Sequence, residues 1–247
     1  RDDVESRGLG DVYKRQNINF VRTPFVALMR SRLGIDNVKI SNDANCAALG
    51  ETMFGAGRGA KNSVTVTLGT GVGTGIVVDG RLLTGNKSAG AEGGHVIIKA
   101  GGVKCGCGKR GCFEAYASAT ALMRQTAEAA ARHPESLLAK MAAESGIDGK
   151  TAFIAAKQGD KTAKRVISNY IRYVGTGLVG FANVFYPEVF IIGGGISKEG
   201  DALIVPLRRF IKKNAYGAEF NPPIDVVAAT LGNDAGIIGA AALAMAD

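Results

Sequence analysis

The sequence predicts an α/β protein in which helices cover a mixed sheet. Alternating apolar residues at 63–68 are followed by a glycine turn and further strand signals, which indicates a hairpin-rich first part. After residue 160, long helical patterns alternate with short apolar strands. Hairpins followed by alternating helices and strands are typical of a mixed sheet with helices on its faces.

The chain is long enough for a large folded core. It has 247 residues, 46% of them hydrophobic, which suits one large domain or two lobes. No apolar run reaches the roughly 18 residues of a membrane span, and no charged-then-apolar leader opens the chain. We therefore expect a soluble, cytoplasmic protein without a membrane partner.

The net charge of +8 raises the question of a nucleic-acid partner. Most basic residues are scattered, and the one dense group, at positions 208, 209, 212 and 213, falls on a single predicted helix. A solvated helix face explains such a group, and no aromatic residues alternate with basic ones as on a base-stacking surface. We expect no nucleic-acid partner for these residues, and the charge favours the approach of a phosphate-bearing substrate.

Helix and strand signals alternate from residue 17 onward. Asn42 or Asp43 can cap a helix that runs to about Phe54. Asp79-Gly80 predicts a hairpin turn, and apolar residues recur every three or four positions between Val166 and Phe185. The expected strands are 38–40, 63–68, 75–78, one from 81, 189–192 and 224–227, and the expected helices are 24–33, 42–54, 114–132, 160–185, 201–214 and one from 235.

The strongest chemical signal is a histidine followed by three cysteines: His95, Cys105, Cys107 and Cys112. One imidazole and three thiolates make a closed tetrahedral zinc site, whereas an iron–sulfur cluster prefers four thiolates. Three ordinary thiols near a histidine are the alternative. The glycines between the cysteines allow a short loop to fold around a metal, so we predict a zinc-stapled loop over residues 95–112.

Two carboxylates flank this loop. Glu92 precedes His95 by three residues and Glu114 follows Cys112 by two. A lone glutamate is ordinarily a solvated surface group, but a metal loop fixes these two at its ends. Because carboxylates bind hydroxyl groups strongly, we interpret both as acceptors for sugar hydroxyls.

Two glycine-rich turns and one polar pair complete the set. The turn within residues 68–75 joins two strands and can present N–H groups to phosphate. The turn within residues 191–197 leads from a buried strand into a helix and can seat a nucleotide. Each is a weak signal alone. Asn42-Asp43 can be a helix cap, or Asp43 can accept the proton of a substrate hydroxyl, because an ordinary aspartate suffices for phosphoryl transfer.

Five segments in this order resemble the ROK family (repressor, open reading frame, kinase) and its sugar kinases: NDANCAALGE, LGTGVGTGIVVDG, AGAEGGHV, CGCGKRGCFEAYAS and IIGGGIS. The resemblance covers the chain from about Asn17 to its end. It implies the two-lobed actin-like (ribonuclease H-like) ATPase fold, with sugar and ATP in the cleft.

The resemblance also implies roles for single residues. Asp43 is then the catalytic base, and Asn42, Glu92, His95 and Glu114 contact the sugar, with His95 also holding zinc through its other ring nitrogen. Gly69, Thr70, Gly71 and Gly73 match the second phosphate loop, and Gly194 and Gly195 match the adenosine region. The implied cofactors are ATP, Mg²⁺ and structural Zn²⁺, and the implied assembly is a homo-oligomer, a dimer or tetramer.

The start of the chain departs from the family. Family members begin with a strand and a glycine-rich first phosphate loop whose aspartate helps to place magnesium, and no segment here matches them. Residues 1–16, with RGLGDVYKRQ, resemble translated sequencing-adapter sequence and are expected to be non-native or disordered. We expect a remnant of the first lobe at 17–60, the second lobe at 61–232 and a returning helix at 233–247. We also expect residues 1–247 alone not to phosphorylate sugar.

Phosphorylation of a hexose by ATP, from glucose to glucose 6-phosphate, is the function that the resemblance favours. Kinases for N-acetylglucosamine, N-acetylmannosamine or fructose are alternatives. A sugar-sensing ROK repressor, with its DNA-binding part outside these residues, is a second alternative. A zinc-stabilised binding module without catalysis is a third, disfavoured because a scaffold has no use for Asn42-Asp43.

Overall fold

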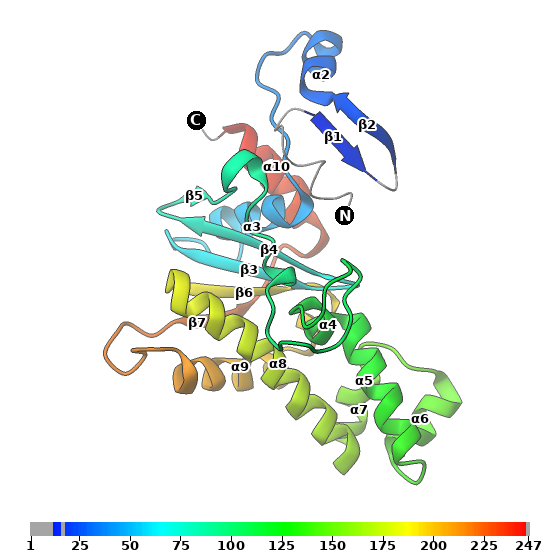
Figure 1. Cartoon of the computed structure of the whole chain (residues 1–247). Helices are drawn as coiled ribbons and strands as arrows, with labels where there is room; N and C mark the ends of the chain where they lie inside the picture. Colours follow the sequence, from blue (N-terminus) through cyan, green and yellow to red (C-terminus); the bar gives the residue numbers. More distant parts are fainter. Residues whose placement is uncertain (1–11, 16–17, 246–247) are drawn as a thin grey trace.

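A five-stranded mixed sheet forms the centre of the molecule (Figure 1). The computed structural model describes residues 12–15 and 18–245. The strand order is β5-β4-β3-β6-β7. The strands are β3 (Ser63–Leu68), β4 (Val72–Val78), β5 (Arg81–Leu82), β6 (Val189–Gly193) and β7 (Asp225–Ala228). The first three are antiparallel neighbours and the last two run parallel to β3, as predicted for a mixed sheet.

The hairpin at Asp79-Gly80 is confirmed. Both residues have positive φ, 50° and 75°, and Val78 pairs with Arg81 across the turn. Two successive left-handed residues match the right-handed twist of the flanking strands. The second hairpin strand begins at Val72, three residues before the predicted start, because Val72 already pairs with Leu68. The glycine turn between β3 and β4 is therefore shorter than the glycine pattern suggested.

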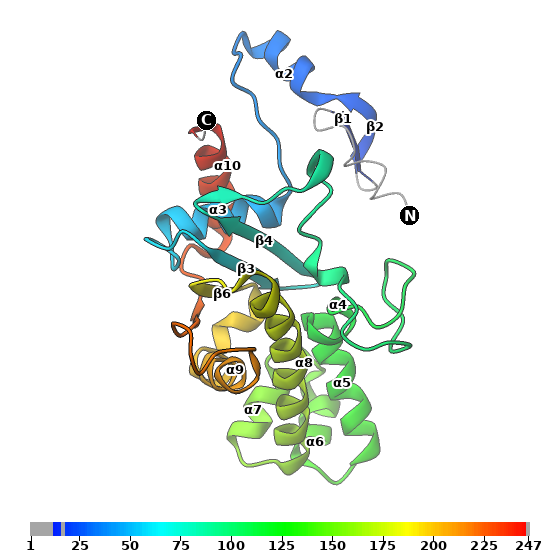
Figure 2. The same cartoon turned by 60° about the vertical axis from the view of Figure 1, so that its left-hand side comes forward.

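Helices cover both faces of the sheet (Figures 1 and 2). On one face lie α3 (Asp43–Phe54) and α10 (Ala235–Met245), and on the other lie α8 (Lys161–Phe185) and α9 (Asp201–Asn214). The core between β3, β6 and α8 is apolar and fully buried at Val66, Tyr170 and Leu178. The step of three or four residues along α8 thus places one apolar stripe against the sheet.

A helical arm extends from the sheet on the α8 side (Figure 2). It consists of α5 (Ala119–Arg132), α6 (Leu137–Ser145), α7 (Thr151–Lys157) and the first half of α8. The short helix α4 (Glu114–Ala117) precedes α5. The predicted single helix over 114–132 is wrong: Ser118 has an extended ψ of 160° and its side chain caps α5 by accepting the Ala121 N–H. A serine at an N-cap competes with helix continuation.

The predicted strand at 38–40 is also wrong. The segment runs without a ladder partner among the described residues and connects α2 (Phe25–Leu33) to α3. Before it, β1 (Val12–Arg15) and β2 (Ile18–Pro24) form an antiparallel pair. The prediction that residues 1–16 are foreign falls mostly outside the described residues, and the division into lobes stays a prediction.

No helix of the described chain combines the length and apolar character that crossing a membrane requires. Four short 3-10 helices lie in the connections: η1 (Asn86–Ser88), η2 (Gly93–His95), η3 (Gly195–Glu199) and η4 (Gly232–Asp234). Two of them, η2 and η3, lie at the ends of the segments that the sequence analysis assigned to the sugar and the nucleotide.

Helices α3 and α10 touch through glycines. A side chain at Gly50 would meet the Ala235 carbonyl oxygen at 2.5 Å, and one at Gly239 would meet the carbonyl of Cys46. We predict that Gly239→Val separates the two helices and lowers the free energy of unfolding by about 1–3 kcal/mol, the usual range for overpacking. Urea denaturation measures it.

The matched control is Gly236→Ala on the same helix. A side chain there meets no atom within 4 Å, and alanine favours the helix by up to about 1 kcal/mol. An unchanged stability of Gly239→Val would contradict the close helix contact.

Candidate active site

Asn42 and Asp43 form the start of α3. Asn42 has extended backbone (φ −76°, ψ 163°) and its side-chain oxygen accepts the Asn45 N–H at 2.7 Å, so it is the N-cap. The cap occupies its oxygen and leaves its NH₂ group for a ligand. Asp43 follows in the first turn, exposed, with one carboxylate oxygen 3.0 Å from the Ala44 nitrogen. The positive end of the helix dipole stabilises a carboxylate at that position.

Two cavities meet at Asp43. The first, about 410 Å³, is lined by Asn42, Glu92, His95 and Glu114 together with the turn between β3 and β4. The second, about 470 Å³, is lined by Gly193, Gly194 and Gly195 and by the segment that precedes α10. Asp43, Ala44 and Thr67 line both cavities. The structure therefore brings together the residues that the sequence analysis assigned to the sugar, and it places Asp43 between them and the second glycine turn.

The turn between β3 and β4 is anchored from the other side by α4 and α5. The Ala119 N–H donates to the Gly69 carbonyl at 2.8 Å, and the Thr120 hydroxyl donates to the Thr70 carbonyl at 2.9 Å. Glu114 accepts the Val72 N–H at 3.0 Å. A side chain at Gly71 would meet this carboxylate at 2.5 Å, so the glycine is required for the close approach.

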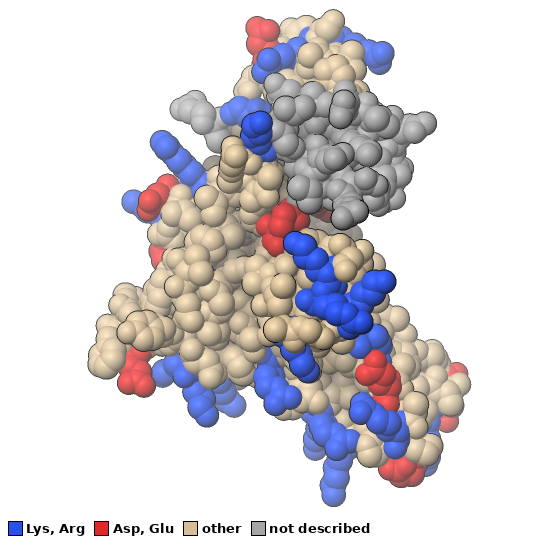
Figure 3. All heavy atoms as spheres, in the orientation of Figure 1, with Lys and Arg blue, Asp and Glu red and all other residues tan. Residues whose placement is uncertain are grey.

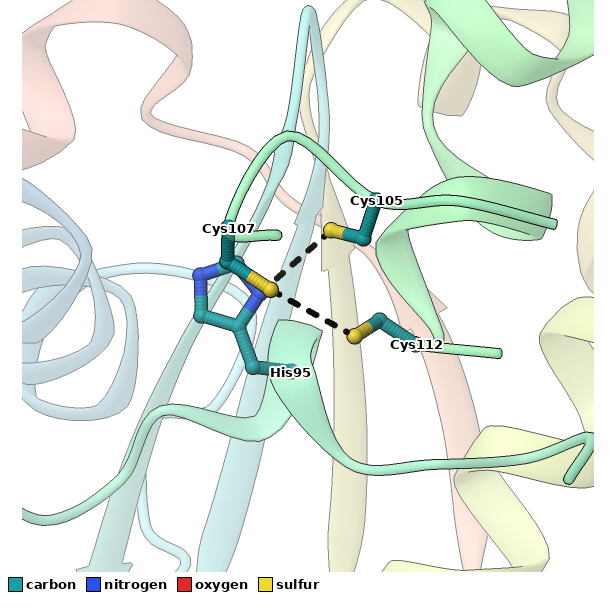
Figure 4. A group of neighbouring side chains, drawn as sticks. All are labelled: His95, Cys105, Cys107 and Cys112. Atoms are coloured by element: carbon teal, nitrogen blue, oxygen red, sulfur yellow. Dashed lines mark hydrogen bonds between the residues drawn. The ribbon is translucent and has the colours of Figure 1, made fainter. Parts of the chain in front are cut away.

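The cysteine loop gathers His95, Cys105, Cys107 and Cys112 (Figure 4), and their ligand atoms all lie within 4.8 Å of one another. Cys107 Sγ lies 3.6 Å from Cys112 Sγ, and Cys105 Sγ lies 3.8 Å from Nδ1 of His95. Four ligands at about 2.0–2.3 Å from one zinc ion lie roughly 3.5–3.8 Å apart. The geometry and the donor set therefore fit a tetrahedral metal, with the other nitrogen of His95 left for the first cavity.

The pKa values of the three thiols shift in different directions. Burial raises the pKa of Cys105 to about 12 and also raises the pKa of Cys112. Burial raises that of Cys107 too, but hydrogen bonds from the Lys109 backbone and the other two thiols lower its pKa overall. Glu114 lies beside the cluster, with one oxygen 3.5 Å from Cys105 Sγ. The carboxylate is thus held between the cluster and the glycine turn, and it faces the first cavity.

The second cavity contains residues that the sequence analysis missed. Gly194 has φ 83°, and a side chain on it would meet the Leu68 backbone at 2.5 Å, so the predicted glycine turn is confirmed as a close backbone contact. Another wall is formed by Glu51 and by residues 229, 230, 232, 233, 235 and 236. In the sequence, the glycine and asparagine of LGNDAG indicate a turn at that wall, but no pattern there indicates a binding site.

Glu51 is almost fully buried, 1% exposed, and it organises that wall. Its two oxygens accept the N–H groups of Ala56, Thr230 and Leu231 at 2.9, 3.1 and 2.7 Å. A carboxylate can accept all of these bonds. Glu51 therefore ties α3 to the chain that leads into α10.

We predict that Glu51→Gln loosens this wall. One acceptor oxygen becomes an NH₂ donor that faces backbone N–H groups, so the free energy of unfolding falls by about 2 kcal/mol. Chemical denaturation measures the change. Glu128→Gln is the matched control, because the Glu128 side chain is 52% exposed; equal effects of both substitutions would contradict the role of Glu51.

The sequence model of the ROK family matches residues 4–247. This chain belongs to the ROK family. The ROK chain is 40% identical over 243 residues to a glucokinase of Streptomyces coelicolor, across 97% of this chain and 76% of the relative. It is 44% identical over 207 residues to a glucokinase of Thermotoga maritima, across 83% of this chain and 65% of the relative.

A solved structure agrees with this assignment. The ROK family glucokinase from Streptomyces griseus, crystallised with glucose and AMPPNP, superposes with a TM-score of 0.82 at 37% identity, over 97% of this chain and 79% of that chain. The α/β fold with its mixed sheet is thus that of ROK sugar kinases, members of the actin-like ATPase superfamily. Repressors also match: a xylose repressor of Caldicellulosiruptor bescii is 28% identical over 96% of this chain and 59% of the repressor.

Proposed function

We propose that this ROK chain is the sugar-binding and nucleotide-binding part of an ATP-dependent hexose kinase that converts glucose to glucose 6-phosphate. The observation that carries the proposal is the place of Asp43 on the wall shared by both cavities. A phosphoryl group that moves between a nucleotide and a sugar has to cross such a boundary.

The first cavity suits a sugar. Its lining includes the carboxylates of Glu92, Glu114 and Asp43, the Asn42 amide and the His95 ring. Several polar groups around one cavity can fix the orientation of a ligand with hydroxyls around a ring. In the proposed reaction the sugar hydroxyl oxygen bonds to the terminal phosphorus of ATP, the bond between that phosphorus and ADP breaks, and Asp43 accepts the hydroxyl proton.

The two glycine turns suit the phosphates and the nucleoside. We assign the phosphate contacts to Gly69, Thr70, Gly71 and Gly73, and the adenosine region to Gly194 and Gly195, with Mg²⁺ as the accompanying cation. The tight turn of β3 into β4 and the left-handed Gly194 support this assignment, since both expose backbone without side chains.

We further propose that His95, Cys105, Cys107 and Cys112 hold a structural zinc ion. When bound, zinc supplies a rigid tetrahedral link between the two ends of the loop. This link keeps Glu114 and His95 in place in the first cavity. Glu114 accepts the Val72 N–H and lies beside Cys105, and His95 directs one ring nitrogen toward the cluster.

Other sugars and a regulatory function are the remaining candidates. N-acetylglucosamine, N-acetylmannosamine and fructose are alternative substrates. The repressor relatives favour a sugar-sensing function, but at 28% identity they are more distant than the glucokinases at 40%. We also propose a cytoplasmic homo-oligomer. The strongly exposed side chains of Val184, Tyr216 and Phe220 support association with a second copy.

A kinase assay with glucose, N-acetylglucosamine, N-acetylmannosamine and fructose tests which sugar is the substrate. The assay uses residues 1–247 beside a version whose residue 17 is preceded by a family-type strand and first phosphate loop. We expect phosphorylation in the extended version with glucose preferred. Phosphorylation of none of the sugars by either version would contradict the proposed function.

Substitution of Asp43 tests the mechanism in the same extended version. Asp43→Asn should lower kcat about 100-fold or more, the usual scale for a lost general base, while glucose affinity changes far less. Asp79→Asn is the control, because Asp79 is an exposed hairpin residue outside both cavities. Near-normal turnover of Asp43→Asn would exclude Asp43 as the base.

Metal content tests the zinc proposal independently of turnover. Purified wild-type protein should contain one zinc ion per chain by elemental analysis, and Cys107→Ser should lose it, because structural zinc contributes on the order of 10 kcal/mol to a small site. Glucose affinity should fall sharply with the zinc, while nucleotide affinity is retained. Cys46→Ala is the control, since Cys46 lies on α3 outside the cluster. Wild-type protein without zinc would overturn the proposal.

A further inference from the structure

A third cavity, which we call the basic cavity, lies away from the candidate active site. It has a volume of about 600 Å³ and lies between the cysteine loop (residues 95–112), α5 and α8. Its cationic lining residues are Lys99, Arg124, Arg132 and Arg165. Among the described residues that line it, Glu128 is the single carboxylate. Figure 3 shows Lys and Arg side chains gathered around the cysteine loop and along the helical arm.

The arginines of the basic cavity are held in place by the protein. Arg124 donates to the Ala115 carbonyl at 2.8 Å and to the Glu128 carboxylate at 3.0 Å, and Arg132 donates through Nε to the Glu128 carbonyl at 3.0 Å. Arg165 contacts Nε2 of His133. A guanidinium has five N–H donors, so each arginine keeps at least three for a ligand within the described structure.

The floor of the basic cavity adds an aromatic surface and a further donor. The rings of Tyr116 and Tyr173 are 4.7 Å apart between centroids, and Tyr116 is 4% exposed. The Tyr116 hydroxyl accepts the Val103 N–H at 2.7 Å. The same hydroxyl carries a proton that it can donate. An oxygen of a bound ligand can accept that proton.

We propose that the basic cavity binds a small phosphorylated metabolite. Four cations face one carboxylate, and this excess exceeds what a single carboxylate ligand can neutralise. Arginine forks bind phosphoryl oxygens in pairs, and the half-buried Tyr173 ring offers an apolar surface to the organic part of the ligand. A nucleic-acid surface instead needs exposed aromatic rings for bases, and Tyr116 is buried.

The basic cavity shares its walls with the sugar-binding machinery. Lys99 and Gly101–Val103 belong to the loop that holds the four metal-binding residues, and the Tyr116 hydroxyl holds Val103. Tyr116 also follows Glu114 by two residues on α4. Occupancy of the basic cavity therefore alters the loop that positions His95 and Glu114; this coupling, unlike the binding itself, rests on the proposed function.

Isothermal titration with pyrophosphate tests the site on the purified, zinc-loaded chain. The double variant Arg132→Ala/Arg165→Ala should bind pyrophosphate about tenfold or more weakly than the wild type, since both lost side chains make charged hydrogen bonds. The matched control, Arg209→Ala/Lys212→Ala, removes the same charge from exposed positions of α9 and should bind within about twofold of the wild type. Circular dichroism verifies that both variants are folded. Any pyrophosphate that binds in the nucleotide cavity does so in both double variants, so the difference between their affinities still reports on the basic cavity.

Three results would overturn the site: no pyrophosphate binding by the wild type, an equal loss in both double variants, or tighter binding of a short RNA than of pyrophosphate. The coupling is measured as the glucose affinity with and without saturating pyrophosphate. We expect a change of about fivefold or more in the wild type and a clearly smaller one in Arg132→Ala/Arg165→Ala, where pyrophosphate remains only in the nucleotide cavity. An unchanged wild-type affinity would overturn the coupling, whereas a failure to bind glucose at all would count against the proposed function and not against the site.

Discussion

The candidate active site depends on the close packing of α3 against β4. Gly73 and Gly75 of β4 lie directly under Ala44 and Ala48 of α3, where a side chain on Gly73 would meet the Ala44 methyl at 2.9 Å. Without side chains between them, the first turn of α3 lies on the sheet beside Thr67. This contact, and not the local sequence at Asp43, puts the carboxylate on the wall shared by both cavities.

A second constraint links the parts of the chain that line the first cavity. Glu114 accepts the Val72 N–H with one oxygen and lies beside Cys105 with the other. Glu114 therefore links the turn between β3 and β4, the cysteine loop and the start of α4. Such mutual support holds ligand-binding groups in fixed positions.

Much of this arrangement could be predicted from the sequence, because it depends on local rules. The cap at Asn42, the hairpin at Asp79-Gly80 and the long apolar stripe of α8 each follow from residues close in the chain. The cysteine cluster was predictable because few other chemistries use that residue spacing. The prediction of a strand at 38–40 was wrong because a strand needs a hydrogen-bonded partner strand, and the sequence pattern does not show whether one is present.

The missed parts of the site arise from long-range packing. In the sequence, Glu51 is one polar residue on a predicted helix. In the structure it accepts backbone N–H groups of Thr230 and Leu231, about 180 residues later. At the break at Ser118, the local cap is accompanied by long-range contacts of α5 with the glycine turn, through Ala119 and Thr120. Neither pairing leaves a trace in composition or periodicity.

In the proposed reaction, Asp43 faces both a sugar and a phosphoryl donor. The ¹³C chemical shift of a selectively labelled Asp43 carboxylate, recorded with glucose alone and with a nonhydrolysable ATP analogue alone, measures this most directly. Each ligand should shift the Asp43 signal, and the signal of Asp79, outside both cavities, should stay in place. A response to only one of the two ligands would exclude this position of Asp43 between the two substrates.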